Sequence, residues 1–160
     1  MPITNELDVI HVHIGEVKLG DSGSTLKAIL GSCVGIGLIW KATGKIALAH
    51  CLLPHGEDTH KSGKFVNQAV ETLLKILEVE SSQLKELEAV VAGGASMYEE
   101  IGKGAMKVGQ LNAQAAIEAL ESKKIRIVFK DLGNTFGRQL ILNGQTGEYQ
   151  VRILEGFKKD

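Results

Sequence analysis

The 160-residue chain lacks most of the features that would assign it at once to a specialised class. Lys and Arg number 18 against 19 Asp and Glu, and no basic cluster exceeds the short patch Lys123-Lys124-x-Arg126. We therefore expect no nucleic-acid partner, since phosphate backbones are bound by basic surfaces. No apolar run is long enough to cross a bilayer, and residues 1–8 lack the form of a signal peptide. These absences predict a cytosolic protein without membrane insertion.

Cysteine and proline are also scarce, with two residues of each. In a reducing cytosol, a structural disulfide between Cys33 and Cys51 is not expected. The composition is 44% hydrophobic and 23% charged with 19 glycines, which is typical of a soluble globular protein. The length suits one ordinary domain, so we expect residues 1–160 to form a single domain.

The first half of the chain has the pattern of β-strands. Ile10, Val12 and Ile14 alternate with histidines over residues 8–14, which predicts a strand with one buried face. Two apolar stretches follow, at 26–30 and 34–40, separated by Gly31-Ser32-Cys33. The second is predicted to form a hairpin, through a Thr43-Gly44 turn, with a strand that begins at residue 45 and stops before Pro54.

The second half alternates helices and strands. Apolar residues recur at helical spacing over 65–77, and a second helix is expected over about 105–123. Strands are expected at 87–92, 125–130, 139–142 and 149–154, the last two flanking a turn whose Gly144 and Gly147 supply positive φ. The order predicts an α+β layered sandwich, with two long helices packed on a mainly antiparallel sheet.

Cys33 and His50 are the residues best placed for chemistry. Cys33 lies at a glycine-rich break where small neighbours let a substrate approach, as a thiol nucleophile requires, although a buried inert cysteine fits the same pattern. His50 ends an apolar strand and reaches Cys33 if the two strands pair, although core histidines are common in such strands. Cys51 should point to the opposite face of its strand and belong to the core.

Other ligand sites are disfavoured by spacing. His11, His13, His55, His60 and Cys51 are of zinc-binding types, but no Cys-x-x-Cys or His-x-x-x-His pair occurs, so no metal is expected. The glycines at 93–94 and 102–104 complete neither the Walker nor the dinucleotide fingerprint. Tight turns are the simpler explanation for them, and no cofactor is expected.

Five segments, in order and at compatible spacing, resemble the CheD family of chemoreceptor glutamine deamidases over about residues 14–152. They are Leu30-Gly31-Ser32-Cys33-Val34, Ala49-His50-Cys51-Leu52-Leu53-Pro54, Ala92-Gly93-Gly94-Ala95-Ser96-Met97, Asp131-Leu132-Gly133-Asn134-Thr135-Phe136-Gly137-Arg138 and the Thr146-Gly147 turn. The resemblance implies a layered α/β fold like that of toxin glutamine deamidases. It also implies cytoplasmic hydrolysis of selected glutamine side chains on methyl-accepting chemoreceptors, without a cofactor.

In the implied mechanism Cys33 attacks the amide carbon and His50 transfers the proton. Backbone N–H groups around Ser32 and Cys33 stabilise the oxyanion, and Gly31 and Ser32 form the oxyanion or substrate loop. Members of the family often have a threonine six residues before the cysteine, which orients the histidine. Lys27 stands there in this chain. Thr25, Ser32 or a backbone carbonyl are the candidates for this third role.

The alternative is that the third member is missing and catalysis is weak. The chain would then act chiefly as a chemotaxis binding module for receptors and for the phosphatase CheC, with which members of the family interact.

Overall fold

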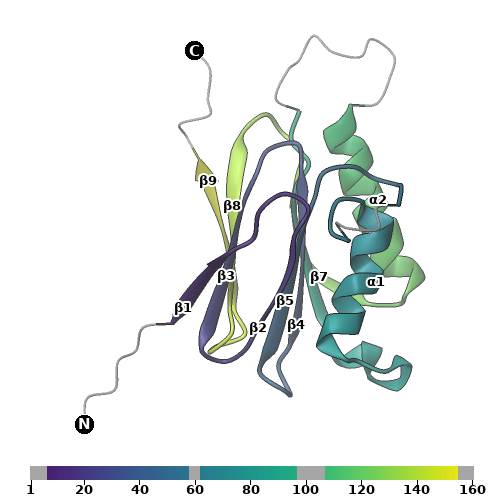
Figure 1. Ribbon diagram of the computed structural model, residues 1–160. Helices are drawn as coiled ribbons and strands as arrows, with labels where there is room; N and C mark the ends of the chain where they lie inside the picture. The colour runs from purple at the N-terminus through teal and green to yellow at the C-terminus, as the bar shows by residue number, and fades with distance from the viewer. Residues whose placement is uncertain (1–6, 58–61, 97–106, 155–160) are drawn as a thin grey trace.

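The computed structural model describes residues 7–57, 62–96 and 107–154, which form three layers: two β-sheets face to face, and helices on the outer face of the second sheet (Figure 1). Sheet A has the order β1 (Asp8–His11), β3 (Ser24–Leu30), β8 (Gly137–Asn143) and β9 (Tyr149–Leu154). Sheet B has the order β2 (Val17–Gly20), β5 (Lys45–Cys51), β4 (Val34–Trp40), β6 (Glu88–Gly93) and β7 (Arg126–Leu132). The helices are α1 (Val66–Leu77), α2 (Val108–Ser122) and the short 3-10 helix Ser81–Glu86.

The central strands of sheet B, β4, β5 and β6, are buried on both faces because each face packs against another layer. In β4, the side chains of Val34, Ile36 and Leu38 pack in the cluster under the helices, whereas Ile39 packs between the two sheets. The side chains of one strand alternate between faces. Gly37 lets the sheets approach closely, since a Cβ there would collide with Leu142 and Val90.

The fold class predicted from the sequence is confirmed, with corrections in its parts. Most strand pairs are antiparallel, but β1–β3 and β6–β7 are parallel, and the strands form two sheets rather than one. The predicted strand at 8–14 ends at His11, and Ile14 is 51% exposed rather than buried, because the chain leaves sheet A there and crosses to sheet B. The strand β2 was not predicted. None of the helices in the described ranges combines the length and apolar character needed to cross a membrane.

Both predicted hairpins are present. The β4–β5 turn places Gly44 at φ +77°, and the β8–β9 turn places Gly147 at φ +75°. Gly144 has no positive φ. It is required instead because a Cβ there would collide with the carbonyl of Asp21.

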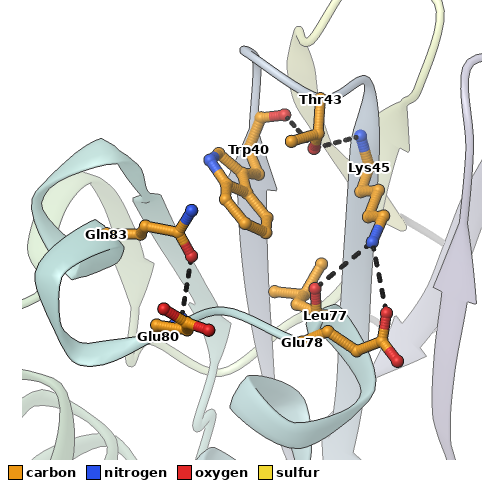
Figure 2. Close-up of polar contacts among 7 residues, drawn as sticks. All are labelled: Trp40, Thr43, Lys45, Leu77, Glu78, Glu80 and Gln83. Carbon is orange, nitrogen blue, oxygen red and sulfur yellow. Dashed lines mark hydrogen bonds and ion pairs between the residues drawn. The ribbon is translucent and has the colours of Figure 1, made fainter.

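The turn end of the β4–β5 hairpin is joined to the helix layer (Figure 2). The indole N–H of Trp40 donates to Glu86 at 2.8 Å. The ammonium of Lys45 donates to the carbonyl of Leu77 at 3.4 Å and lies 3.9 Å from the carboxylate of Glu78. Cys33 and His50 lie at the opposite, open end of this hairpin, so its far end is fixed independently of them.

Candidate active site around Cys33 and His50

The pairing of β4 with β5 directs Cys33 and His50 to the same face of sheet B. His50 stands directly opposite Gly35, and Cys33 lies two residues before Gly35, with the same parity. Cys33 packs in the cluster between the sheets, together with Ile46 and Leu48, which share the parity of His50. Cys33 directly precedes the last pair of the ladder, Val34 and Cys51, so it lies at the end of the hairpin where β5 carries His50. The strand pairing on which the sequence interpretation depended is confirmed.

The hydrogen bond of the His50 ring fixes its tautomer. Nδ1 lies 2.9 Å from the carbonyl oxygen of Val12. A carbonyl only accepts, so Nδ1 carries the hydrogen and Nε2 carries the free lone pair. Nε2 is buried and has no hydrogen-bond partner among the described residues. Burial lowers the pKa of His50, which keeps the ring neutral at pH 7 and able to accept a proton.

The acceptor for Nδ1 is held by backbone hydrogen bonds. The N–H of Val12 donates to the carbonyl of Lys27 at 2.7 Å, which ties the chain after β1 to β3. The N–H of Gly15 donates to the carbonyl of His50 at 2.8 Å, and the N–H of His50 donates to the carbonyl of Glu16 at 3.0 Å. Residues 12–16 therefore wrap the strand that carries His50 and hold its ring acceptor in place.

The segment Gly31-Ser32-Cys33, here called the cysteine loop, has all three of its carbonyls hydrogen-bonded. In chain order their donors are Ala95 N (3.0 Å), Asn112 Nδ2 (3.0 Å) and Gly94 N (2.8 Å). No hydrogen bond joins the N–H of Ser32 or Cys33 to a described residue. A peptide's N–H points opposite to its C=O, so these two N–H groups face away from the donors that hold the loop.

The two cysteines differ as expected from their parity. Cys33 is 6% exposed and lies between the sheets, whereas Cys51 is fully buried in the cluster under the helices. Burial raises the pKa of both thiols. The prediction that Cys51 belongs to the core is confirmed, and Cys33 rests as a thiol that needs a base to become a nucleophile.

The groups considered for orienting the His50 ring lie in different parts of the fold. Leu26, Ala28 and Leu30 of β3 face the inter-sheet cluster, so Thr25 and Lys27 belong to the alternate face of that strand. The backbone carbonyl of Ser32 accepts a hydrogen bond from Asn112. Of the options left open by the sequence, the structure brings a backbone carbonyl, that of Val12, to Nδ1 of His50.

Sequence reasoning missed Asn112. Its side chain is fully buried, and its Nδ2 donates to the carbonyls of Ser32 (3.0 Å) and Leu52 (2.9 Å). The only signal was a polar residue within the small apolar stripe of α2, one turn before Ala115 and Ala116. Val12 could not have been found from its side chain, because it acts through its carbonyl.

The glycines considered for a phosphate loop have a packing role where they are described. Gly93 (φ +110°) packs against the carbonyl of Cys33, and Gly94 (φ +66°) packs against Gly109 of α2, with no room for a Cβ in either place. Residues 102–104, and His60 among the zinc-type residues, lie outside the described residues. Within the described ranges, no three His, Cys, Asp or Glu side chains are grouped as a metal site would need.

A cavity of about 430 Å³ reaches His50 beside the chain that wraps it. Its lining residues are His11, Val12, His13, Ile14, Lys27, Ile29 and His50. Ile14 and Ile29 are half exposed at its edge. The cavity thus offers an apolar rim with one lysine and two histidines next to the candidate base.

Fold and site together define a two-sheet α+β protein with a buried cysteine and histidine on one face of the central sheet. A family model described as CheD chemotactic sensory transduction matches residues 52–153, more than half of the chain. The chain belongs to the CheD family.

Relatives named probable chemoreceptor glutamine deamidases cover nearly the whole chain. The Ruegeria sp. (strain TM1040) protein CheD 2 is 36% identical, over 92% of this chain and 93% of its own. The Bdellovibrio bacteriovorus CheD is 39% identical over 90% and 94%, and the Archaeoglobus fulgidus CheD is 36% identical over 92% and 94%. These alignments extend well beyond the 52–153 segment.

The fold is also similar to a crystal structure of a Neisseria meningitidis protein of the DUF152 family. The TM-score is 0.53 at 13% identity, over 81% of this chain and 65% of that one. At that identity the likeness concerns the fold alone.

Proposed function

We propose that this chain is a cytoplasmic, single-domain deamidase that hydrolyses glutamine side chains of chemoreceptors, with Cys33 as nucleophile and His50 as base. One observation carries the proposal: the Nδ1 of His50 is satisfied by Val12, which leaves a buried Nε2, without a partner in the described part of the chain, on the face of sheet B that also carries Cys33. A histidine held in this tautomer is what a cysteine nucleophile requires. The names of its relatives supply the substrate class.

The reaction needs only groups of this chain and water. Nε2 of His50 takes the thiol proton as Sγ of Cys33 bonds to the amide carbon, and the carbonyl oxygen becomes an oxyanion facing the N–H groups of Ser32 and Cys33. The C–N bond then breaks, the proton passes from His50 to the leaving nitrogen, and ammonia departs from a thioester. Water gives its proton to His50 and attacks the thioester, releasing glutamate and restoring the thiol. No cofactor takes part.

The pKa shifts favour proton transfer during the reaction over a preformed ion pair. Burial raises the pKa of Cys33 and lowers that of His50, so both groups are neutral at rest. The thiolate then forms only as the substrate is attacked, which is general-base catalysis.

Receptor segments would enter by the cavity beside His50. Its apolar rim at Ile14 and Ile29 suits the apolar side chains of a helix, and Lys27 with His11 and His13 suits acidic neighbours of the target.

Mass spectrometry of a receptor cytoplasmic fragment tests the proposal. Wild-type protein should add about one dalton at particular glutamines, the difference between an amide and an acid, and Cys33→Ala should add none. Cys51→Ala, altered only in the core, is the matched control and should keep the activity. Equal modification by Cys33→Ala, or none by wild type, would refute the deamidase.

The binding-module alternative is judged by a second measurement on the same proteins. That alternative depended on the absence of a group that orients the His50 ring. The carbonyl of Val12 is available for this role. CheC remains a predicted partner. If CheC and receptor fragments are retained by immobilised wild-type protein without any mass change, the binding module is the better account.

A further inference from the structure

The carboxamide of Asn112 lies where the β4–β5 ladder ends. The last paired residues are Val34 and Cys51, and the chain then separates into the cysteine loop on one side and Leu52 on the other. Nδ2 of Asn112 donates one hydrogen to the carbonyl of Ser32 and the other to the carbonyl of Leu52. One side chain from α2 thus joins the two arms of the hairpin just beyond Cys33 and His50.

The orientation of this amide is fixed by its partners. Two carbonyl oxygens converge on it, and only the NH₂ end can donate to both. The side chain is fully buried, and its Oδ1 has no partner among the described residues. A buried acceptor left without a partner is costly, so a residue chosen only for packing at this place would be apolar.

The helix is close enough to do this because of glycines. Gly109 packs its backbone against the carbonyls of Gly94 and Ala95, whose N–H groups hold the other two carbonyls of the cysteine loop. Asn112 follows one turn later. The start of α2 and the end of β6 therefore hold the loop together, and Asn112 is the only side-chain donor to it among the described residues.

We propose that Asn112 is a positioning residue for the deamidation. By holding the carbonyl of Ser32, it turns the following N–H, that of Cys33, toward the oxyanion, and by holding Leu52 it keeps His50 in register with Cys33. The inference deepens the proposed function and rests on it for the kinetic readout. It assigns Asn112 no contact with the substrate.

The kinetic test compares Asn112→Ala with Leu120→Ala. Leu120 is fully buried on the same helix, so its truncation removes packing without touching the loop. Asn112→Ala should lower kcat by roughly 10- to 100-fold with little change in KM, the effect expected when reacting groups shift by about an ångström. Leu120→Ala should keep kcat near wild type at a temperature where both variants are folded. Equal kcat losses in the two variants would reduce Asn112 to a structural role.

A second readout does not depend on activity. The alkylation rate of Cys33 by iodoacetamide should rise in Asn112→Ala, because a released loop exposes the thiol and removes the burial that raises its pKa. Cys51, in the other core cluster, should stay unreactive and reports global unfolding. An unchanged Cys33 rate would overturn the inference. If the wild-type protein shows a protected Cys33 but no deamidation, the proposed function is refuted. The role of Asn112 in holding the cysteine loop is not.

If Asn112→Ala fails to fold, the wild-type chain still provides a test. The carboxamide hydrogens of Asn112 should exchange with solvent far more slowly than those of Gln114, which lies exposed on the same helix. Asn112→Ser retains a single donor, so the alkylation rate of its Cys33 should lie between the rates of wild type and Asn112→Ala. Exchange as fast as in Gln114 would show that Asn112 does not form its two hydrogen bonds to Ser32 and Leu52.

Discussion

At the scale of single residues, the ring of His50 is held in one tautomer by the backbone. Its Nδ1 donates to a backbone carbonyl, so the tautomer does not depend on any one side chain. The ring can therefore be oriented although Lys27 stands where the family is expected to have a threonine. The lysine still contributes, because its own carbonyl accepts from the N–H of Val12.

The substitution Lys27→Thr distinguishes two possibilities: that the carbonyl of Val12 orients His50, or that the orienting group is missing because Lys27 replaces a threonine. If Val12 orients His50, restoring the threonine should leave kcat near wild type, although KM can shift because Lys27 lines the cavity. Steady-state deamidation of a receptor fragment provides both constants. A large rise in kcat would mean that the third member is missing in the natural chain.

The pH dependence of activity follows from the buried ring. Burial, the largest cause, lowers the pKa of His50, and the reaction needs the neutral ring. Activity should therefore fall only as the pH drops below the ordinary histidine value of about 6.5. The acid limb of kcat/KM reports this group in the free enzyme. A midpoint above that value would contradict a buried, neutral base.

At the scale of elements, the glycine-rich end of β6 is what lets three segments meet. The cysteine loop, β6 and the start of α2 come together backbone to backbone at Gly93, Gly94 and Gly109. Side chains at these places would separate the helix from the loop it holds. The glycines serve packing, and the proposed deamidation depends on that packing.

Gly93→Ala tests this contact against a matched control, Gly133→Ala. Both glycines have positive φ, +110° and +89°, but a Cβ at Gly133 meets no atom within 4 Å, whereas at Gly93 it collides with the carbonyl of Cys33. Gly133→Ala should cost roughly 1–2 kcal/mol of backbone strain. Gly93→Ala should cost about 1–3 kcal/mol more and reduce deamidation. Denaturant unfolding measures both, and equal losses would contradict the collision.

Elements with strong local patterns were predictable, and those that depend on distant pairing were not. The β4–β5 hairpin follows from two apolar runs around Thr43-Gly44. The strand β2 has only four residues, too short a pattern to predict a strand, and it pairs with β5. The division into two sheets was missed for the same reason, since alternation shows which residues are buried but not which strands pair.

At the scale of the whole molecule, sheet B lies between two layers, and its burial brings titratable groups into the core. Cys33 and His50 lie on its inner face and Cys51 on its helix-facing side. Titratable groups in such a place are shielded from water and make folding sensitive to pH.

The stability of the fold should therefore decrease at both extremes of pH. The unfolded chain protonates His50 near its ordinary pKa of about 6.5, while the folded chain resists, so stability falls as the pH drops below that value. The unfolded thiols ionise near 8.5, while the raised pKa values keep the folded thiols protonated, so stability also falls above it.

Urea unfolding across pH measures this profile. His50→Gln should flatten its acid side, and Cys51→Ala should flatten its alkaline side. Profiles unchanged by these substitutions would mean that other groups govern the pH dependence.

The candidate site was predictable only where it consists of reactive side chains. Cys33 and His50 stand in distinctive contexts, so the sequence pointed to both. Asn112 resembles an ordinary helix residue, and Val12 acts through its backbone. Both became visible only once distant segments were placed together.

The most direct test of the Cys33–His50 pair is the single-turnover rate of receptor deamidation at neutral pH in four chains: wild type, Cys33→Ala, His50→Gln and Cys51→Ala. If Cys33 is the nucleophile and His50 its base, wild type and Cys51→Ala form product, Cys33→Ala forms none, and His50→Gln loses at least about 100-fold, as expected for removal of the base. Near-wild-type rates in folded His50→Gln, or product from Cys33→Ala, would contradict these roles.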